Sequence, residues 1–392
     1  MKTKPLTQVC NITTGKLDAN AETPSGKYPF FTCAPSPLRI DTFAFDDDAI
    51  LLAGNNAQGN FHIQRYKGKF NAYQRTYVIT AKSGYDIDYI KYSLELSLQH
   101  LKRVAQGSQT KFLTMQILDS FQVVDSPYDD QKRLIGSVRE IDKKISTNLD
   151  ICSELDNLAK AIYDYWFTQF DFPDVDGKPY RSSGGAMEWN ELLKRNIPMG
   201  WTTGTVSSLM KIENTSVDPK KLGNTVMEHY SIPAFDVDHC PAYEEANTIE
   251  SSKYAVDPEC ILTSKLNPHF KRLWDPYCDT ENAICSTEFI VYRPRTSWMR
   301  PFCYAVLNSD AFYIHMSSKA TASTGSRKRI QPDVSASFEL PIPDETTMRS
   351  FVALYGPIME KQKALYKENR ELTKLRDWLL PMLMNGQATV TE

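Results

Sequence analysis

The chain carries two stripes of mostly apolar residues with the four-and-three spacing of a coiled-coil heptad. Each position of the second stripe lies 217 residues after its counterpart in the first. This spacing predicts two long amphipathic helices that share one register. The apolar members of the predicted seam are Leu134, Val138, Ile141, Ile145, Leu155, Ile162, Phe351, Tyr355, Ile358, Leu365, Leu372 and Leu379, and the polar members include Asn148, Gln362, Asn369 and Arg376.

The repeat continues upstream of both stripes, where Leu6 aligns with Val206 at an offset of 200. Residues 48–54 likewise resemble residues 259–265, and the run that begins at Tyr77 resembles the run that begins at Phe289. The offset grows from 200 to 217 as expected if loops drift while a core is kept. We therefore interpret the chain as a duplicated unit whose two long helices pair with each other. The alternative is that each helix packs only on its own globular domain.

Short apolar or β-branched runs, separated by Gly, Pro and Asn, predict strands upstream of each helix, for example at 49–53 and 289–292. The expected fold class is α+β, with two tandem sheet domains that are each followed by a long helix. The expected boundaries are 1–125 for the first domain, 126–167 for its helix, 168–200 for a connector, 201–341 for the second domain, and 342–392 for the second helix and tail. Gly356-Pro357 leaves the start of that helix open, because proline breaks or kinks a helix interior, and Pro381 is expected to end its regular part.

The composition is that of a globular protein, with 392 residues, 41% hydrophobic content and a formal net charge of −3. This charge gives no global sign of a nucleic-acid partner, so any such claim rests on local patches. No signal peptide or stretch of membrane-spanning length is visible, which predicts a cytoplasmic protein with no membrane partner. The eight cysteines are scattered, as expected of reduced thiols rather than a disulfide framework.

Fragments that resemble catalytic motifs each lack a residue that their chemistry needs. Gly54 and Gly59 have the spacing of a phosphate-binding loop, but Asn60 stands where the lysine belongs. The segment 267–270 (Asn-Pro-His-Phe) is one residue from the loop that grips a flipped adenine in amino-methyltransferases, yet the chain has no Gly-x-Gly turn for a methyl donor. No Cys-x-x-Cys or His-x-x-x-His pair supports a metal site. The sequence therefore predicts a non-catalytic chain that binds no cofactor or metal of its own.

Polar, locally basic loops recur at matching places in the two repeats. Gln, Asn and Arg side chains can pair with base edges, and Lys commonly fixes phosphates. One such run is usually a solvated face, whereas recurrence at equivalent positions favours a shared binding role. The candidate DNA-binding residues are Gln58, Asn60, Lys67, Lys69, Arg75, Gln109 and Lys111 in the first copy, and Lys265, Asn267, Lys271, Arg272, Lys319, Arg327, Lys328 and Arg329 in the second.

The architecture and several motifs together resemble the specificity subunits of Type I restriction-modification systems, over nearly the whole chain. The most specific motif is the connector at 162–185, which contains Phe-Asp-Phe-Pro-Asp-Val-Asp-Gly-Lys-Pro-Tyr-Arg-Ser-Ser-Gly-Gly and continues to Trp201. Further similarities are the Gly-Ser turns at Gly107 and Gly325, the Pro-Ile-Pro segment at 341–343, and the segment 379–387 at the end of the last helix.

This resemblance implies a division of labour. Each sheet domain would be a target-recognition domain that reads one half of a bipartite site in double-stranded DNA, and the helices, paired as an antiparallel coiled coil, would set the gap. The chain would direct two modification subunits, which methylate adenine N6 with S-adenosylmethionine, and restriction/translocase subunits, which use ATP and Mg²⁺. The target sequence, the gap length and the number of restriction subunits stay open.

Two other functions also fit the residues. A two-headed scaffold that binds only protein would show no salt-dependent affinity for DNA, whereas phosphate contacts make log K fall linearly with log salt. A lone DNA-binding regulator would bind an operator tightly as a single subunit. Salt dependence and the need for partner subunits therefore distinguish the three functions.

Overall fold

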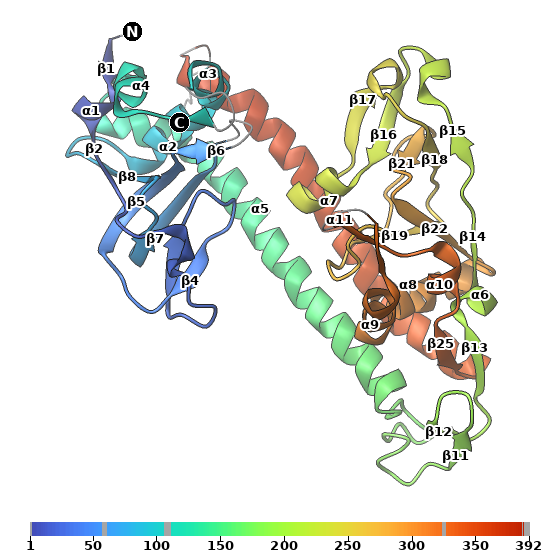
Figure 1. The fold of residues 1–392 in the computed structure, drawn as a ribbon. Helices are drawn as coiled ribbons and strands as arrows, with labels where there is room; N and C mark the ends of the chain where they lie inside the picture. Colours follow the sequence, from blue (N-terminus) through green and yellow to red (C-terminus); the bar gives the residue numbers. More distant parts are fainter. Residues whose placement is uncertain (1, 57–60, 106–110, 324–326, 386, 388–392) are drawn as a thin grey trace. The chain divides into compact units, whose positions relative to one another are not determined.

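The computed structural model describes residues 2–56, 61–105, 111–323, 327–385 and 387. The predicted α+β class is confirmed, because two sheet domains are each followed by a long helix, α5 (Tyr128–Tyr163) and α11 (Glu345–Met384) (Figure 1). The chain forms two compact units, one of residues 1–144 with 372–392 and the other of residues 145–371. Each unit therefore contains part of both long helices.

The first unit is built on a six-stranded sheet. Its strands, in spatial order, are β2 (Cys10–Thr14), β8 (Thr76–Ala81), β5 (Phe45–Ala53), β7 (Ile63–Ala72), β3 (Tyr28–Phe31) and β4 (Leu38–Ile40). Only β3 and β7 pair in parallel, and the other neighbours are antiparallel. Successive residues of β5 face opposite sides of the sheet. Ile50 and Leu52 join a core shared with helices, whereas Ala49 and Leu51 face a smaller core, so this strand is apolar on both faces.

Short elements surround this sheet. They are β1 (Thr3–Pro5), α1 (Leu6–Val9), the 3-10 turn η1 (Ala19–Ala21), β6 (Asn55–Asn56), α2 (Ile87–Leu96), α3 (Leu98–Val104), β9 (Lys111–Phe112), α4 (Met115–Ser120) and β10 (Gln122–Val124). Strand β1 pairs with β10 and β6 pairs with β9, both antiparallel.

Polar contacts attach the start of α5 to the first domain. Asp86 caps α2 by accepting from the backbone N–H groups of Asp88 and Tyr89. Arg139 of α5 donates to both oxygens of Asp86 at 2.7 and 2.8 Å and to Asp88 at 2.7 Å. The fully buried Gln131 of α5 accepts from the Asp86 N–H at 2.8 Å. These contacts fix the first helix against α2.

The second unit contains two larger sheets. The four-stranded sheet is ordered β14 (Met210–Ile212), β22 (Phe289–Pro294), β19 (Ile261–Ser264) and β20 (Leu273–Trp274). The five-stranded sheet is ordered β15 (Ser216–Val217), β18 (Lys253–Ala255), β21 (Ala283–Cys285), β16 (Val226–Tyr230) and β17 (Ala242–Glu245), with only β16 and β21 parallel. Paired short strands are β11 (Met187–Asn190) with β12 (Arg195–Pro198), β13 (Thr202–Thr205) with β25 (Glu339–Ile342), and β23 (Thr321–Ser323) with β24 (Arg327–Arg329).

The helical elements of this unit are mostly short. They are the π-helical turn η2 (Asp164–Thr168) that extends α5, then α6 (Val206–Leu209), η3 (Pro219–Leu222), α7 (Ile232–Asp238), η4 (Ala246–Thr248), η5 (Ser297–Met299), α8 (Arg300–Asn308), α9 (Asp310–Lys319) and α10 (Pro332–Ala336). The connector after η2 places Phe170 and Phe172 in the main core, where both contact Trp201.

The duplication inferred from the sequence is visible in the sheets. The strand order β2-β8-β5-β7 of the first copy recurs as β14-β22-β19-β20 in the second. The runs that align in the sequence occupy β5 and β19, and β8 and β22. Leu6 and Val206 each begin a one-turn helix, and β10 and β25 each precede a long helix. The larger second copy adds the five-stranded sheet.

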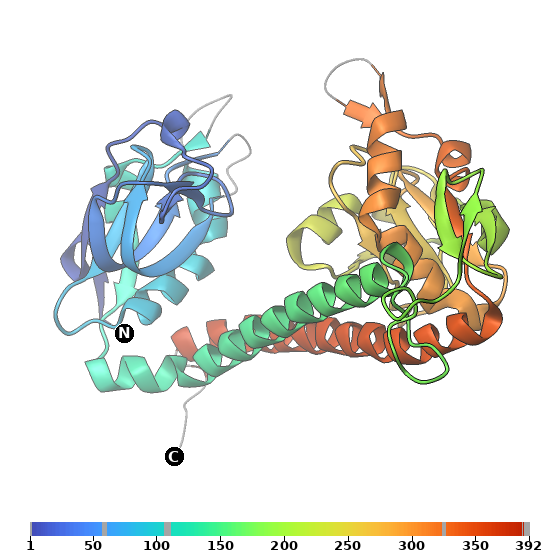
Figure 2. The same ribbon diagram turned by 90° about the horizontal axis from the view of Figure 1, so that it is seen from below.

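The predicted pairing of the long helices is confirmed, and the ribbon views show their segments side by side (Figure 2). In the second unit Asn148 contacts Asn369, and Gln362 contacts the Cys152 carbonyl. In the first unit Asp142 contacts Arg376. In the second unit, contacts at higher residue numbers of α5 involve lower residue numbers of α11, so the two helices are antiparallel. Of the predicted seam, the described structure buries Val138, Phe351, Tyr355, Ile358 and Leu365, and half-buries Leu134, Ile141, Ile145, Leu155, Ile162, Leu372 and Leu379.

Two prolines do not interrupt α11, so the expectation that Pro381 ends its regular part is wrong. The helix begins at Glu345, runs through Pro357 and Pro381, and ends at Met384. A proline removes one helical donor, which leaves the carbonyl four residues earlier without its N–H partner. Those carbonyls belong to Ala353 and Asp377, both exposed residues. Solvent can therefore hydrogen-bond to the two carbonyls, and the side chains that flank each proline pack in hydrophobic cores that hold the helix.

All eight cysteines are free thiols. Burial is the largest cause that raises the pKa of Cys10, to about 12, and of Cys152, to about 11. Among the described residues, none of the helices is long and apolar enough to span a membrane.

Candidate nucleic-acid interface

The predicted basic residues of the first domain lie at two separate places. Lys67 and Lys69 are exposed on the same face of β7, opposite Asp48 and Asp46 of β5. The Lys69 ammonium lies 4.7 Å from the centre of the half-exposed Phe43 ring, a cation–π contact. This face is therefore mixed in charge rather than uniformly basic.

Arg75 and Lys111 lie at the other end of β5. The Gly54 N–H donates to the Arg75 carbonyl at 2.8 Å, and the Leu113 N–H donates to the Gly54 carbonyl at 2.8 Å. Lys111 pairs with Asn56 across β6 and β9. The structure thus joins the stems of the two predicted loops, although Gln58, Asn60 and Gln109 lie outside the described residues. At about 3.4 Å per residue, Asp46 and Ala53 are roughly 24 Å apart along β5, so Lys69 does not join this group.

In the second domain, four predicted residues come together at one surface. Leu266 forms a bridge with Arg329, and the Ile330 N–H donates to the Lys265 carbonyl at 3.1 Å. Asn267 and Lys328 exchange hydrogen bonds, with the Asn267 N–H donating to the Lys328 carbonyl at 2.7 Å and the Lys328 N–H donating to the Asn267 Oδ1 at 3.0 Å. We call this the 265–270/327–329 surface.

Asn267 has a structural part in this surface. Its φ of 49° lies in the left-handed region, which asparagine tolerates better than most residues. Both its main chain and its side-chain oxygen bond the main chain of Lys328. Asn267 therefore holds the loop against β24. These bonds fix the backbone of Lys328, whose side chain is exposed.

Charged groups around this surface are partly compensated. Arg329 donates to the two oxygens of Glu288 at 2.6 and 3.2 Å. Burial is the largest influence on Lys265 and lowers the pKa of its ammonium, while Glu288 opposes this effect. Lys319 is exposed at the end of α9, just before β23. The side chain of Arg327 is outside the described part of the structure.

Two predicted residues have internal partners. Arg272 makes a bidentate contact with Asp236, at 2.7 and 2.8 Å. Lys271 donates to the carbonyl of Asn308, and burial lowers the pKa of its ammonium. Both side chains thus connect parts of the second domain.

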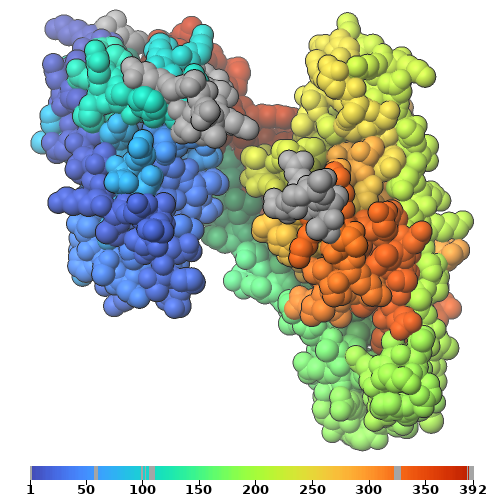
Figure 3. Space-filling model, in the orientation of Figure 1, coloured from blue at the N-terminus to red at the C-terminus, as the bar shows by residue number. Residues whose placement is uncertain are grey.

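Of an aromatic pair on this surface, the sequence pointed to His269 as part of a polar loop but did not point to Phe270 as a binding candidate. The rings of His269 and Phe270 lie 4.2 Å apart, and Phe270 is 53% exposed. The Arg272 guanidinium lies 5.2 Å from the Phe270 ring. In Figure 3, the orange surface that includes α9 lies next to yellow surface, which belongs to residues earlier in the sequence of the same domain. An aromatic residue in a polar loop was the available signal, because exposed aromatic rings can stack on bases or contact methyl groups.

A cavity of about 300 Å³ lies between the second domain and both long helices, within the second unit. Its walls include Lys160, Trp274, Asp275, Gln362 and Lys363. The charged groups are paired, since Lys363 lies 3.2 Å from Asp275 and Lys160 lies 2.9 Å from both Asp164 and Asp310. Among the described residues there is no cluster of three His, Cys, Asp or Glu side chains that suits a metal ion. The named charged groups of the cavity are therefore bound to one another, and its described lining forms no metal centre.

Comparison with known proteins agrees with this architecture. Residues 1–156 match the family model described as the Type I restriction modification DNA specificity domain. The chain is 59% identical over 78 residues to the Type I restriction enzyme EcoDI specificity subunit of Escherichia coli, a match that covers 20% of this chain and 17% of that protein. It is 22% identical over 328 residues to the Type I restriction enzyme MjaIX specificity subunit of Methanocaldococcus jannaschii, covering 80% and 72% of the two chains.

The fold also has a solved counterpart. The S subunit of a Type I restriction-modification system from M. genitalium superposes with a TM-score of 0.59, over 97% of this chain and 95% of that one. Its sequence identity is 14%, so this likeness is a likeness of fold.

Proposed function

Because this chain belongs to the family of Type I restriction-modification specificity subunits, we propose that it is the DNA-reading subunit of such a system, with each sheet domain reading one half of a bipartite target. The observation that carries this proposal is the repeated strand order, with a long helix after each copy. Two related domains suit two half-sites, because each copy presents its own loops to DNA. The family model covers residues 1–156. Because the second copy repeats the strand order of the first, we assign the same role to the second domain.

Phosphate and base contacts are assigned to the basic side chains at and beside these surfaces. In the first domain they are Lys67, Lys69, Arg75 and Lys111, together with Gln58, Asn60 and Gln109, which lie outside the described residues. In the second they are Lys265, Lys319, Arg327, Lys328 and Arg329. Asn267, Lys271 and Arg272 stay in the proposed set, and their contacts to Lys328, Asn308 and Asp236 support a part in shaping the surface.

The antiparallel helices are proposed to set the gap between half-sites. Their contacts include the buried amides of Asn148 and Asn369, which are 0% and 6% exposed. A polar group on a helix seam penalises other registers, because a shifted register would bury it without a partner. A fixed register gives the helix pair a fixed length, as a spacer between two reading domains requires.

Catalysis is assigned to partner subunits. Two modification subunits would methylate adenine N6 with S-adenosylmethionine, and restriction/translocase subunits would use ATP and Mg²⁺. The two copies of the repeat offer two related docking surfaces for the modification subunits. This division of labour agrees with a chain whose motifs each lack a residue required for catalysis.

The test is to express the chain with the modification subunit encoded beside it and to map methylated adenines across a genome. The control omits this chain, and variants carry Arg329→Ala, Lys328→Ala or, as a matched control, Lys220→Ala. Lys220 is an exposed lysine of the same domain that pairs with Glu250 at 3.0 Å. A bipartite motif that requires the chain supports the proposal. The Arg329 variant then relaxes one base position if Arg329 reads guanine, or weakens all sites alike if it holds phosphate.

Two outcomes would replace the proposal. If an active modification subunit methylates the same sites without this chain, and DNA affinity shows no salt dependence, a protein-binding scaffold is the better description. If the isolated chain binds one operator tightly and changes no methylation, it is a regulator.

A further inference from the structure

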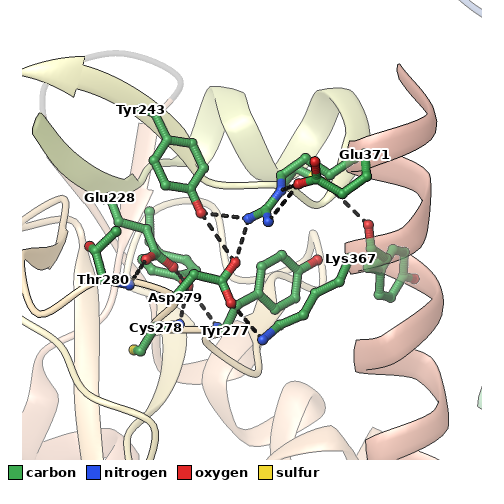
Figure 4. Close-up of polar contacts among 12 residues, drawn as sticks. Glu228, Tyr243, Tyr277, Cys278, Asp279, Thr280, Lys367 and Glu371 are labelled. Carbon is green, nitrogen blue, oxygen red and sulfur yellow. Dashed lines mark hydrogen bonds and ion pairs between the residues drawn. The ribbon is translucent and has the colours of Figure 1, made fainter. Parts of the chain in front are cut away.

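A buried carboxyl group organises one loop of the second domain. Glu228 of β16 is 0% exposed, and its carboxyl accepts from the Tyr230 hydroxyl and, at 2.9 Å, from the Thr280 N–H. The Tyr230 oxygen in turn accepts from the N–H groups of Tyr277 and Cys278, at 2.6 and 3.0 Å. Figure 4 shows Glu228 next to Thr280 and Cys278 of the loop at 277–280. The main chain of this loop is therefore fixed from inside the domain.

The same loop presents Asp279 to helix α11. One Asp279 oxygen lies 2.6 Å from the Lys367 ammonium, and the other accepts from Arg370 at 2.5 Å (Figure 4). Arg370 also donates to the Tyr243 hydroxyl at 2.6 Å, and its guanidinium lies 5.3 Å from the Tyr243 ring. The side chains of Asp279 and Arg370 are 26% and 17% exposed. Two cations of one helical face thus hold one carboxylate of the domain.

A second contact lies next to this one. The His239 ring stacks on Tyr366 of α11, with centroids 5.5 Å apart and planes 9° apart. Tyr277 connects the two contacts, since its hydroxyl donates to the His239 carbonyl at 2.5 Å and its ring lies 5.9 Å from the Lys367 ammonium. The loop, the end of α7 and one face of α11 are therefore held together.

Directional polar contacts define an angle better than apolar contacts do. Apolar packing is non-directional, whereas a charge-assisted hydrogen bond loses strength when its geometry changes. Asp279 is fixed by its loop, and Arg370 has a planar fork that is further held by Glu371 at 2.9 Å. A rotation of the domain on α11 would have to break several of these bonds together.

We propose that Asp279, Lys367 and Arg370 form a positioning clamp that fixes the angle of the second recognition domain on α11, and thereby narrows the gap lengths that the complex accepts between half-sites. This inference rests on the proposed DNA-reading function. The three residues are positioning residues in this proposal, because their charged groups bind one another across the contact between the domain and α11. Loss of the clamp should change the gap that is tolerated and leave the bases that are read unchanged.

The experiment uses the full chain assembled with its modification subunits. The substrate is a pool of duplexes that carry the wild-type half-sites with gaps from three base pairs shorter to three longer than the natural gap. Selectivity is the methylation rate at the natural gap divided by the rate at gaps one base pair different. Variants are Asp279→Asn, Asp279→Lys, Arg370→Glu and the double variant Asp279→Lys with Arg370→Glu. The matched control is Glu250→Gln, which removes the carboxylate of the exposed Lys220–Glu250 pair in the same domain.

Asp279→Asn should lower gap selectivity about fivefold, as expected for loss of an ion pair of this kind. Half-site base preference should stay, Glu250→Gln should behave as wild type, and the reversed pair should regain selectivity over either single reversal. If the Asp279 and Arg370 variants melt earlier but keep wild-type selectivity, the clamp is merely structural and the inference is wrong. If the wild-type complex shows no methylation that depends on this chain, the proposed function itself has failed.

Discussion

The buried amide pair on the helix seam gives a quantitative prediction. The Asn148 Nδ2 donates to the Asn369 Oδ1 at 2.8 Å and to Glu368 at 2.8 Å, and the Asn369 Nδ2 donates to the Ile145 carbonyl at 3.3 Å. The Asn148 Oδ1 is buried and has no hydrogen-bond partner. The perturbation is Asn148→Leu and Asn369→Leu, made singly and together.

The magnitude follows from which groups each variant strands. Asn148→Leu leaves the Asn369 Oδ1 without its donor, and Asn369→Leu removes one of the two acceptors of the Asn148 amide. A stranded buried group costs about 1–3 kcal/mol, whereas burial of a leucine side chain contributes about 1.5–3 kcal/mol. The local stability of the helix pair should therefore be unchanged or lower in each single variant. The double variant strands no side-chain amide and gains both leucines, so we expect an interaction energy of about 1–2 kcal/mol in favour of the double variant.

Native-state hydrogen exchange, followed by mass spectrometry on peptides of residues 145–155 and 362–371, measures this energy locally. The local readout is needed because a chain with two compact units need not unfold in two states. Since 1.36 kcal/mol corresponds to a factor of ten, amides of the seam should exchange roughly fivefold to thirtyfold more slowly in the double variant than the two single effects predict. Additive single effects would refute the reasoning, because the two amides would then not depend on each other.

Three further predictions concern single positions. Gly136→Ala should stabilise α5 by about 0.5–1 kcal/mol, because an added Cβ meets open space and a helix-interior glycine is costly, and slower exchange of amides near 136 would show it. Gly15→Ala should destabilise the first domain strongly, because its Cβ would lie 1.9 Å from the Ala72 carbonyl oxygen, and a raised thermal midpoint would contradict this. Burial alone would raise the pKa of Asp279, but hydrogen bonds from Lys367 and Arg370 outweigh it and lower that pKa. The folded-state pKa is thus below the unfolded value of about 3.9, so the clamp should stabilise fully above about pH 4 and lose its contribution as the pH falls through the folded value; Asp279→Asn should lack this dependence in thermal melts.

The fold was predictable to the extent that local patterns encode it. The four-and-three spacing located both helices, and the apolar runs at 49–53 and 289–292 located strands β5 and β22. Proline chemistry alone misplaced the end of α11, because the helix rule at Pro381 does not include the packing of neighbours such as Leu380 and Leu383 in the core of the first domain, where they are 5% and 4% exposed. Tertiary packing outweighed a local penalty there.

For the candidate interface, the sequence could predict only the types of side chain that take part, not the partners that each one has. Side-chain type pointed to Lys265, Lys328 and Arg329, and the structure brings them together. The same reasoning did not show that Arg272 pairs with Asp236, or that the loop presents Phe270 to solvent. An arginine in a basic run looks the same in a sequence whether its partner is a phosphate or a carboxylate of its own domain.

The duplication, the helix register and several core strands can be read from the residues alone, because each depends on residues a few positions apart or on a similar offset between two copies. The tertiary structure alone decided which charged groups meet. Asp279 and Arg370 are separated by 91 positions, and Asn148 and Asn369 by 221. Contacts at such separation obey no periodicity, since they depend on how folded elements are placed in space. The clamp on α11 and the amide pair of the seam therefore became visible only in the folded chain.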